Sequence, residues 1–176
     1  VLEAALKADP GRSEVHSELA YAHLESERAD TAINVLTQWQ AQEPAWRWAK
    51  GARAPYANWP RYEADLNLSM IRAYSGDLRT AQHDLEKMVE LAPANGGTQS
   101  SLGNVYMMRG WPRRALERYS IANTLDPRDV SARLGQYDAY VQLQRDDLAR
   151  PIHDSLLERY PNQSSVQRMD RSWKAH

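Results

Sequence analysis

The stretch GGTQSSLGNVYMMRGWPRRALERYSIANTLDPRD, residues 96–129, has small and aromatic residues where two packed helices would need them. Gly103 and Ala115 let the two helices approach closely, because the distance between packed helices depends on the side chains at the contact. Tyr106 and Tyr119 supply large rings that can fill the space between this hairpin and its neighbours. The stretch therefore predicts a helical hairpin that is one unit of a larger stack.

The same spacing recurs along the chain. Prolines that end the units stand at Pro10, Pro44, Pro93, Pro127 and Pro161, with gaps of 34, 49, 34 and 34 residues. An alanine precedes each of the last four prolines by twelve residues, at Ala32, Ala81, Ala115 and Ala149. A 34-residue period with these positions is the signature of the tetratricopeptide repeat. The sequence therefore predicts an all-α fold, a right-handed α-solenoid of helical hairpins with a concave and a convex face.

The repeat divides the chain into a truncated unit, four full repeats, an insert and a final helix. The expected bounds are 1–12 for the second helix of a truncated repeat, 13–46, 62–95, 96–129 and 130–163 for the repeats, 47–61 for the insert and 164–176 for a capping helix. One hairpin cannot bury its apolar face alone, so stacked hairpins must share a continuous core. Because the chain begins inside an amphipathic run, VLEAALKADP, we expect it to be a piece of a longer protein.

The insert RWAKGARAPYANWPR, residues 47–61, contains four basic residues and no acidic one. It has no helical periodicity and therefore reads as a loop. Loops longer than about 12 residues are usually functional or disordered, and the aromatic side chains favour an ordered loop here. The candidate partner-binding residues are Trp48, Arg53, Tyr56 and Trp59. The alternative is that these residues only pack the insert onto the array.

Composition and motifs exclude several classes of function. The 22 Lys+Arg nearly balance the 23 Asp+Glu, so the chain lacks the broad basic face that nucleic-acid binding needs. No apolar run approaches the roughly 20 residues of a membrane helix. The sequence contains no nucleophile or phosphate-binding motif, no cysteine, and no histidine pair at zinc-binding spacing. We therefore expect no enzyme activity, no cofactor and no metal site.

Six short motifs carry a more specific resemblance than the repeat alone. They are EPAW (43–46), NWP (58–60), AYSGDL (73–78), APAN (92–95), RGWPRRA (109–115) and LDPRD (125–129). Together they resemble the periplasmic repeat region of the poly-β-1,6-N-acetyl-D-glucosamine (PNAG) export porin, the PgaA family. The resemblance implies a periplasmic adaptor that precedes a C-terminal outer-membrane β-barrel of the same chain and serves biofilm polysaccharide export. It also implies two other partners, the partially de-N-acetylated polymer and its periplasmic deacetylase.

The residues expected to face the concave groove suit such a polymer. They include four carboxylates and no base, and carboxylates attract the cationic amines of glucosamine units. Tyrosine rings can stack on the C–H faces of sugars. The candidate glycan-binding residues are Glu14, Tyr21, Glu25, Glu63, Tyr74, Asn104, Asp138 and Gln142.

A second function stays open at this point. Most tetratricopeptide repeats are protein–protein scaffolds, so the groove could instead bind a peptide, with the tyrosines belonging to the core. The repeat alone favours this scaffold, whereas the insert and the turn motifs favour the exporter.

Overall fold

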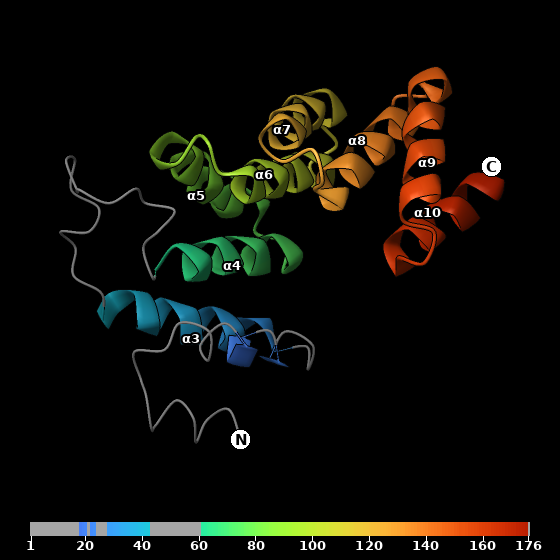
Figure 1. Cartoon of the computed structure of the whole chain (residues 1–176). Helices are drawn as coiled ribbons and strands as arrows, with labels where there is room; N and C mark the ends of the chain where they lie inside the picture. Colours follow the sequence, from blue (N-terminus) through green and yellow to red (C-terminus); the bar gives the residue numbers. More distant parts are fainter. Residues whose placement is uncertain (1–17, 21, 24–27, 43–60, 176) are drawn as a thin grey trace. The chain divides into compact units, whose positions relative to one another are not determined.

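The computed structural model describes residues 18–20, 22–23, 28–42 and 61–175. The regular secondary structure in these ranges is α-helical, with no strand (Figure 1), and confirms the predicted all-α fold class. The chain forms two compact units, Val1–Pro93 and Ala94–His176. None of the helices in the described ranges is long and apolar enough to cross a lipid bilayer.

The first unit contains three helices with defined bounds, α3 (Ala29–Gln42), α4 (Arg61–Tyr74) and α5 (Leu78–Leu91). Helix α4 packs against both α3 and α5. The core of the α3–α4 layer is a cluster of buried apolar residues, Ala20, Ala32, Leu36, Leu68 and Ile71. Helix α5 buries Ala81, Leu85 and Met88. Their spacing of three and four residues places them on one face, which is why this polar sequence folds as an amphipathic helix.

The turn between α4 and α5 is defined by its own residues. Gly76 adopts a φ of 98°, a left-handed conformation that glycine tolerates at no steric cost. Asp77 then caps α5, because its carboxylate accepts a hydrogen bond from the Thr80 backbone N–H at 3.2 Å. An ion pair between Arg72 and Asp84 also joins the two helices.

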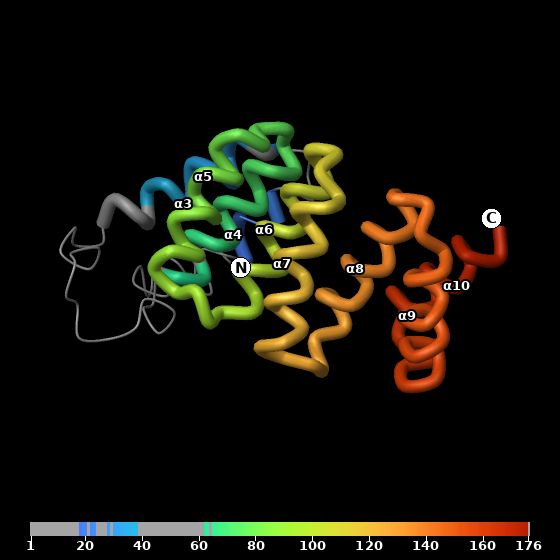
Figure 2. Tube along the Cα trace, turned by 90° about the horizontal axis from the view of Figure 1, so that it is seen from above, coloured from blue at the N-terminus to red at the C-terminus, as the bar shows by residue number. Residues whose placement is uncertain are grey.

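The second unit contains five helices, α6 (Gly96–Met108), α7 (Pro112–Leu125), α8 (Val130–Gln142), α9 (Asp146–Arg159) and α10 (Ser164–Lys174). Each of these helices packs against the next one in sequence, and α6 also contacts α8. Figure 2 follows the trace from α6 through α7 and α8 to the pair formed by α9 and α10. The helix order therefore builds successive hairpins whose first helices, α6 and α8, are neighbours.

Short polar residues and prolines place the ends of these helices. Asn95 caps α6 by accepting from the Thr98 N–H at 3.0 Å, and Asp129 caps α8 in the same way. A proline follows the last residue of α5, α7 and α9 by two positions, at Pro93, Pro127 and Pro161. Proline cannot continue a helix because it lacks an N–H and its ring clashes with the preceding turn.

The alanines of the 34-residue pattern are all inaccessible to solvent. Ala32, Ala81, Ala115 and Ala149 each have 0% exposed surface. A larger side chain at these positions would separate the helices of a hairpin, because the interior is close-packed.

Tyr119 fills the space between α6 and α8. Its side chain is 1% exposed, and its ring lies against Gly103 of α6 and Gly135 of α8. A Cβ atom added to Gly103 would lie 2.6 Å from Tyr119 Cε1, and one added to Gly135 would lie 2.5 Å from the same atom. The tyrosine therefore occupies a slot that exists only because both facing residues lack a side chain.

The C-terminal helix α10 covers the apolar face of the α8–α9 hairpin. Val166 and Met169 are buried against Tyr137, Ala149 and Leu156, and Trp173 packs on the edge of this cluster. These contacts give α10 a stabilising role in the second unit, because they remove its apolar stripe from water.

Candidate functional site

A recess of about 310 Å³ lies between α8 and α10. Leu134, Tyr137 and Met169 supply its apolar lining, and the polar lining residues are Asp138, Ser165, Arg168 and Ser172. Tyr137 and Met169 are buried, whereas Asp138, Arg168 and Ser172 are exposed. A recess with an apolar floor and a polar rim can contact both the C–H surface and the hydroxyl groups of a sugar.

Asp138 is the acidic group of this recess. Although the residue is exposed as a whole, the surrounding protein atoms partly desolvate its carboxyl group, and this raises the pKa of the group above the usual range. In the part of the chain that the structure describes, the carboxylate forms no ion pair. Because a nearby cation favours the ionised form of such a group, a cationic ligand in the recess would be attracted to Asp138.

Tyr137 lies next to Asp138 in sequence and forms part of the floor. Burial, followed by the charge of Asp138, raises the pKa of the tyrosine hydroxyl. The hydroxyl is therefore protonated at neutral pH and can donate a hydrogen bond. Its ring centroid lies 6.0 Å from that of Trp173 and 6.2 Å from that of His153.

His153 connects α9 to α10 behind this floor. Its Nδ1 lies 2.8 Å from Asp154 Oδ1, and its Nε2 lies 3.2 Å from Asp170 Oδ1. Lys174 donates a second hydrogen bond to Asp170 at 2.7 Å. The wall of the recess on α10 is thus held by these polar contacts and by the Lys174–Asp170 ion pair, as well as by apolar packing.

Replacing Asp170 with asparagine is expected to lower the stability of the second unit at neutral pH and to have little effect in strong acid. The hydrogen bond from Lys174, and then that from His153, lowers the pKa of Asp170 in the folded protein. A depressed carboxyl pKa stabilises the fold above the unfolded value of about 3.9, and this contribution is lost as the pH falls through the folded value. Urea midpoints at pH 7 and at pH 2 measure the difference.

The matched control is Asp154→Asn, which removes the other carboxylate bound to His153. The side chain of Asp154 is 68% exposed and that of Asp170 is 15% exposed, so solvent screens the Asp154 contact more strongly. The Asp154 variant should therefore change the midpoint less. Equal losses for Asp170→Asn at both pH values would contradict the charge mechanism.

Three predicted glycan-binding residues lie in the second unit. Asp138 lines the recess, and Gln142 is exposed one helical turn further along α8. Asn104 occupies the equivalent position on α6, 34 residues before Asp138, and is half-buried. Its Oδ1 accepts a hydrogen bond from the Tyr119 hydroxyl at 2.7 Å. Part of the Asn104 amide is therefore engaged by the core, and its glycan contact stays a prediction.

Two predicted residues lie on α4 in the first unit. Glu63 is exposed in the first turn, and Tyr74 at the end of the helix is 58% exposed. Eleven residues correspond to three turns, so both lie on the same face of α4. Glu63 also has a structural use there, because a carboxylate is favourable near a helix N-terminus. That Glu63 and Tyr74 line a concave glycan-binding groove stays a prediction.

The remaining candidates lie outside the described residues. They are Glu14, Tyr21 and Glu25 of the groove and Trp48, Arg53, Tyr56 and Trp59 of the insert. Their assignment stays a prediction.

The sequence did not identify the other polar residues of the recess, Ser165, Arg168 and Ser172. They belong to α10, which carries no repeat signature, so their positions relative to Asp138 cannot be read from the 34-residue period. The apolar stripe of α10 is the one sequence feature that could have indicated two of these residues. Ser165 and Ser172 each stand one residue before a stripe member, Val166 and Trp173.

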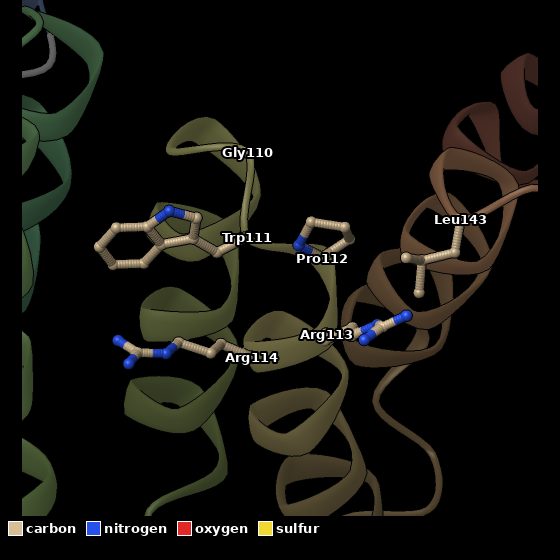
Figure 3. Close-up of a pocket in the computed structure, with 6 residues that line it drawn as sticks. All are labelled: Gly110, Trp111, Pro112, Arg113, Arg114 and Leu143. Carbon is tan, nitrogen blue, oxygen red and sulfur yellow. The ribbon is translucent and has the colours of Figure 1, made fainter.

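A second pocket, of about 440 Å³, lies beside the turn between α6 and α7. It is lined by Gly110, Trp111, Pro112, Arg113, Arg114 and Leu143. Figure 3 shows Pro112 and Arg113 directed toward Leu143 of the α8–α9 connection, with the Trp111 indole above Arg114 on the other side. From the sequence, these turn residues formed a motif of resemblance, and Arg113 and Arg114 were expected to be solvated residues of the turn.

Curated relatives of the chain include an exopolysaccharide exporter. Over 160 residues, the chain is 28% identical to the poly-beta-1,6-N-acetyl-D-glucosamine export protein of Escherichia coli K12. This match covers 91% of the chain and 20% of that protein, so the chain spans about a fifth of the length of this relative. A 70-residue match at 35% identity covers 40% of the chain and 6% of the CTR9 homolog of Arabidopsis thaliana.

Solved structures with a similar fold include tetratricopeptide-repeat proteins. The type IV pilus biogenesis factor PilW matches with a TM-score of 0.71 at 16% identity, over 96% of this chain and 71% of PilW. YrrB, described as a TPR protein with an unusual peptide-binding site, matches with a TM-score of 0.63 at 14% identity, over 97% of this chain and 80% of YrrB. A family model for the tetratricopeptide repeat matches residues 1–54. Together with the helical hairpins, these matches show that the chain has the all-α solenoid fold of tetratricopeptide-repeat proteins.

Proposed function

We propose that this chain is the periplasmic binding and adaptor module of an outer-membrane exopolysaccharide exporter. It contacts partially de-N-acetylated PNAG and docks the periplasmic deacetylase, with no catalytic step of its own. The observation that carries the proposal is the 28% identity to the E. coli export protein, which extends over 91% of the chain. The six sequence motifs, which lie between residues 43 and 129, support the same function.

The recess between α8 and α10 provides the chemistry for the glycan contact. Asp138 attracts the amine of a de-N-acetylated unit, because its partly desolvated carboxylate has no cationic partner among the described residues. Leu134 offers apolar surface to the sugar ring, and Ser165 and Ser172 offer hydroxyl groups. An acetylated unit is neutral and gains only the apolar and hydroxyl contacts. Asp138 therefore favours the de-N-acetylated units of the polymer, and its attraction must exceed the repulsion from Arg168 on the same rim.

The deacetylase contact is assigned to the insert. A basic and aromatic segment is suited to a protein interface, since tryptophan, tyrosine and arginine dominate binding hot spots. Trp48, Arg53, Tyr56 and Trp59 are the residues proposed for this contact.

Asp138→Asn is expected to weaken binding of a partially de-N-acetylated β-1,6-glucosamine oligomer by about two- to fivefold, which corresponds to one exposed ion pair. Binding of the fully acetylated oligomer should not change, because it carries no amine to attract. An NMR titration of the full chain measures both affinities and shows whether amides of α8 and α10 are perturbed. Higher salt should weaken only the de-N-acetylated ligand.

Glu117→Gln is the matched control, because Glu117 is an exposed carboxylate on α7 outside the recess. It removes the same charge and should leave both affinities unchanged. If the two oligomers perturb the same amides equally at all salt concentrations, the electrostatic contact is wrong. If neither oligomer perturbs any amide, the proposed contact between this chain and PNAG is wrong.

A peptide-binding scaffold is the second candidate function. It is favoured by the similarity in fold to YrrB, a TPR protein with an unusual peptide-binding site. The same titration separates the two functions, since a scaffold of this kind would respond to an extended peptide and not to either oligomer.

A further inference from the structure

The turn between α6 and α7 presents two arginines, Arg113 and Arg114, that form no ion pair with the described part of the chain. Residues 109–114 contain three arginines and no acidic residue. Arg113 and Arg114 are both exposed. At the corresponding turn of the next hairpin, Arg145 instead donates two hydrogen bonds to Asp147, at 2.8 and 2.7 Å. At the α6–α7 turn, the position that corresponds to Asp147 is occupied by Arg113, so no carboxylate is present there to pair with an arginine.

The arginines of this turn are partly ordered by aromatic rings. The guanidinium carbon of Arg109 lies 4.0 Å from the centroid of the Trp111 ring, and that of Arg114 lies 5.0 Å from it. Tyr106 supports the indole from α6, with 5.9 Å between ring centroids. Cation–π contacts of this kind restrict the rotamers of the arginines. A ligand that they bind therefore causes a smaller loss of side-chain entropy than it would with mobile arginines.

The same turn exposes apolar surface. Trp111, Pro112 and Leu143 line the pocket of about 440 Å³, whose size lies within the range of ligand pockets, about 300–1,000 Å³. Figure 3 shows the Arg113 side chain directed toward Leu143 across this space. An occupant that fills the pocket must therefore combine an apolar group with a negative charge.

The start of α7 adds to the attraction for a negative charge. Pro112 is its first residue, and Trp111 makes no side-chain capping hydrogen bond. The equivalent residue of the α4–α5 turn, Asp77, caps its helix through a carboxylate. The N-terminus of a helix is electropositive, so it would attract a carboxylate from a bound partner at the start of α7. The carboxylate of Asp77 occupies the corresponding position at the start of α5.

We propose that this pocket binds an acidic segment of a partner protein. An apolar side chain of the segment packs against Pro112 and Leu143, where one carboxylate pairs with Arg113, and a second carboxylate pairs with Arg114 on the side of the turn that carries Trp111. Charge complementarity selects this occupant, because guanidinium groups bind carboxylates through paired hydrogen bonds. The site goes beyond the exporter proposal and does not require it, since a neutral or cationic glycan gains nothing from three arginines.

The test uses the full chain and a synthetic peptide of alternating glutamate and leucine, blocked at both ends. Binding is measured by calorimetry and by the indole N–H signal of Trp111, which Trp111→Phe identifies. The Trp111 signal should shift on addition of the peptide. Replacing both Arg113 and Arg114 with glutamine should weaken binding on the order of tenfold or more, since hydrogen bonds to charged groups are among the stronger ones.

The matched control replaces Arg128 and Arg159 with glutamine, which removes the same charge from exposed residues outside the pocket. This control should bind the peptide with nearly unchanged affinity. Three outcomes would each overturn the proposal: a glutamine–leucine peptide that binds equally well, a control variant that weakens binding as much as the pocket variant, or a peptide that leaves the Trp111 signal unmoved. An oligonucleotide of equal charge that competes equally would also overturn it, because the site would then be a general anion surface.

Discussion

Gly135→Ala is expected to destabilise the second unit by about 1–3 kcal/mol or more, the usual cost of overpacking a close-packed core. In an open helix the same substitution stabilises by roughly 0.5–1 kcal/mol, because glycine loses more backbone entropy on folding than alanine does. The sign reverses here because the new Cβ would lie 2.5 Å from Cε1 of Tyr119, whose ring is enclosed between α6 and α8. Urea unfolding followed by circular dichroism, with amide exchange in α6–α8, measures the effect.

Gly103→Ala should have the same sign, since its Cβ would lie 2.6 Å from the same ring atom. Gly103→Leu should be more damaging, because the added branch must also fit between α6 and α7. The matched control is Gly96→Ala at the start of α6, where the Cβ would meet neighbours only at ordinary distances of 3.6 and 3.8 Å. If all three alanine variants stabilise the chain equally, the close fit around Tyr119 is wrong.

Tyr119→Ala is expected to cost about 3–5 kcal/mol, the range for truncation of a large buried aromatic side chain. The ring is 1% exposed and lies between two glycines, whose lack of side chains limits how far the neighbours can close the cavity. Tyr119→Phe keeps the ring and removes the hydrogen bond to Asn104, at a cost of about 0.5–1.5 kcal/mol. The same urea experiment measures both variants.

A double-mutant cycle tests the physical reason for both effects. In the Tyr119→Ala background, Gly135→Ala no longer meets a ring and should become neutral or stabilising. The expected coupling between the two sites is about 0.5–3 kcal/mol or more, as for residues in direct contact. Strict additivity of the two variants would show that the ring and the glycine do not constrain each other.

The sequence by itself determined the repeating parts of the fold. Spacing alone located the buried alanines, such as Ala81 and Ala149, and the prolines that follow the helix ends. These positions are set locally, because close helix packing requires a small residue and proline cannot continue a helix. It also showed that Gly103 must be small and that Tyr119 belongs to the core. The repeat register also predicts that Asp138 lies on the concave groove face, and this assignment stays a prediction.

Only the tertiary structure decided how residues from different helices combine. Gly135 carries no mark in the repeat pattern, and its importance arises because the Tyr119 ring reaches it from another helix. The recess at Asp138 depends on the position of α10, and the polar contacts of His153 join α9 to that same helix. The pocket at Trp111 likewise forms where the start of α7 faces Leu143. A 34-residue period fixes the spacing of positions along the chain, whereas these contacts depend on how side chains fill the space between helices, which no linear spacing encodes.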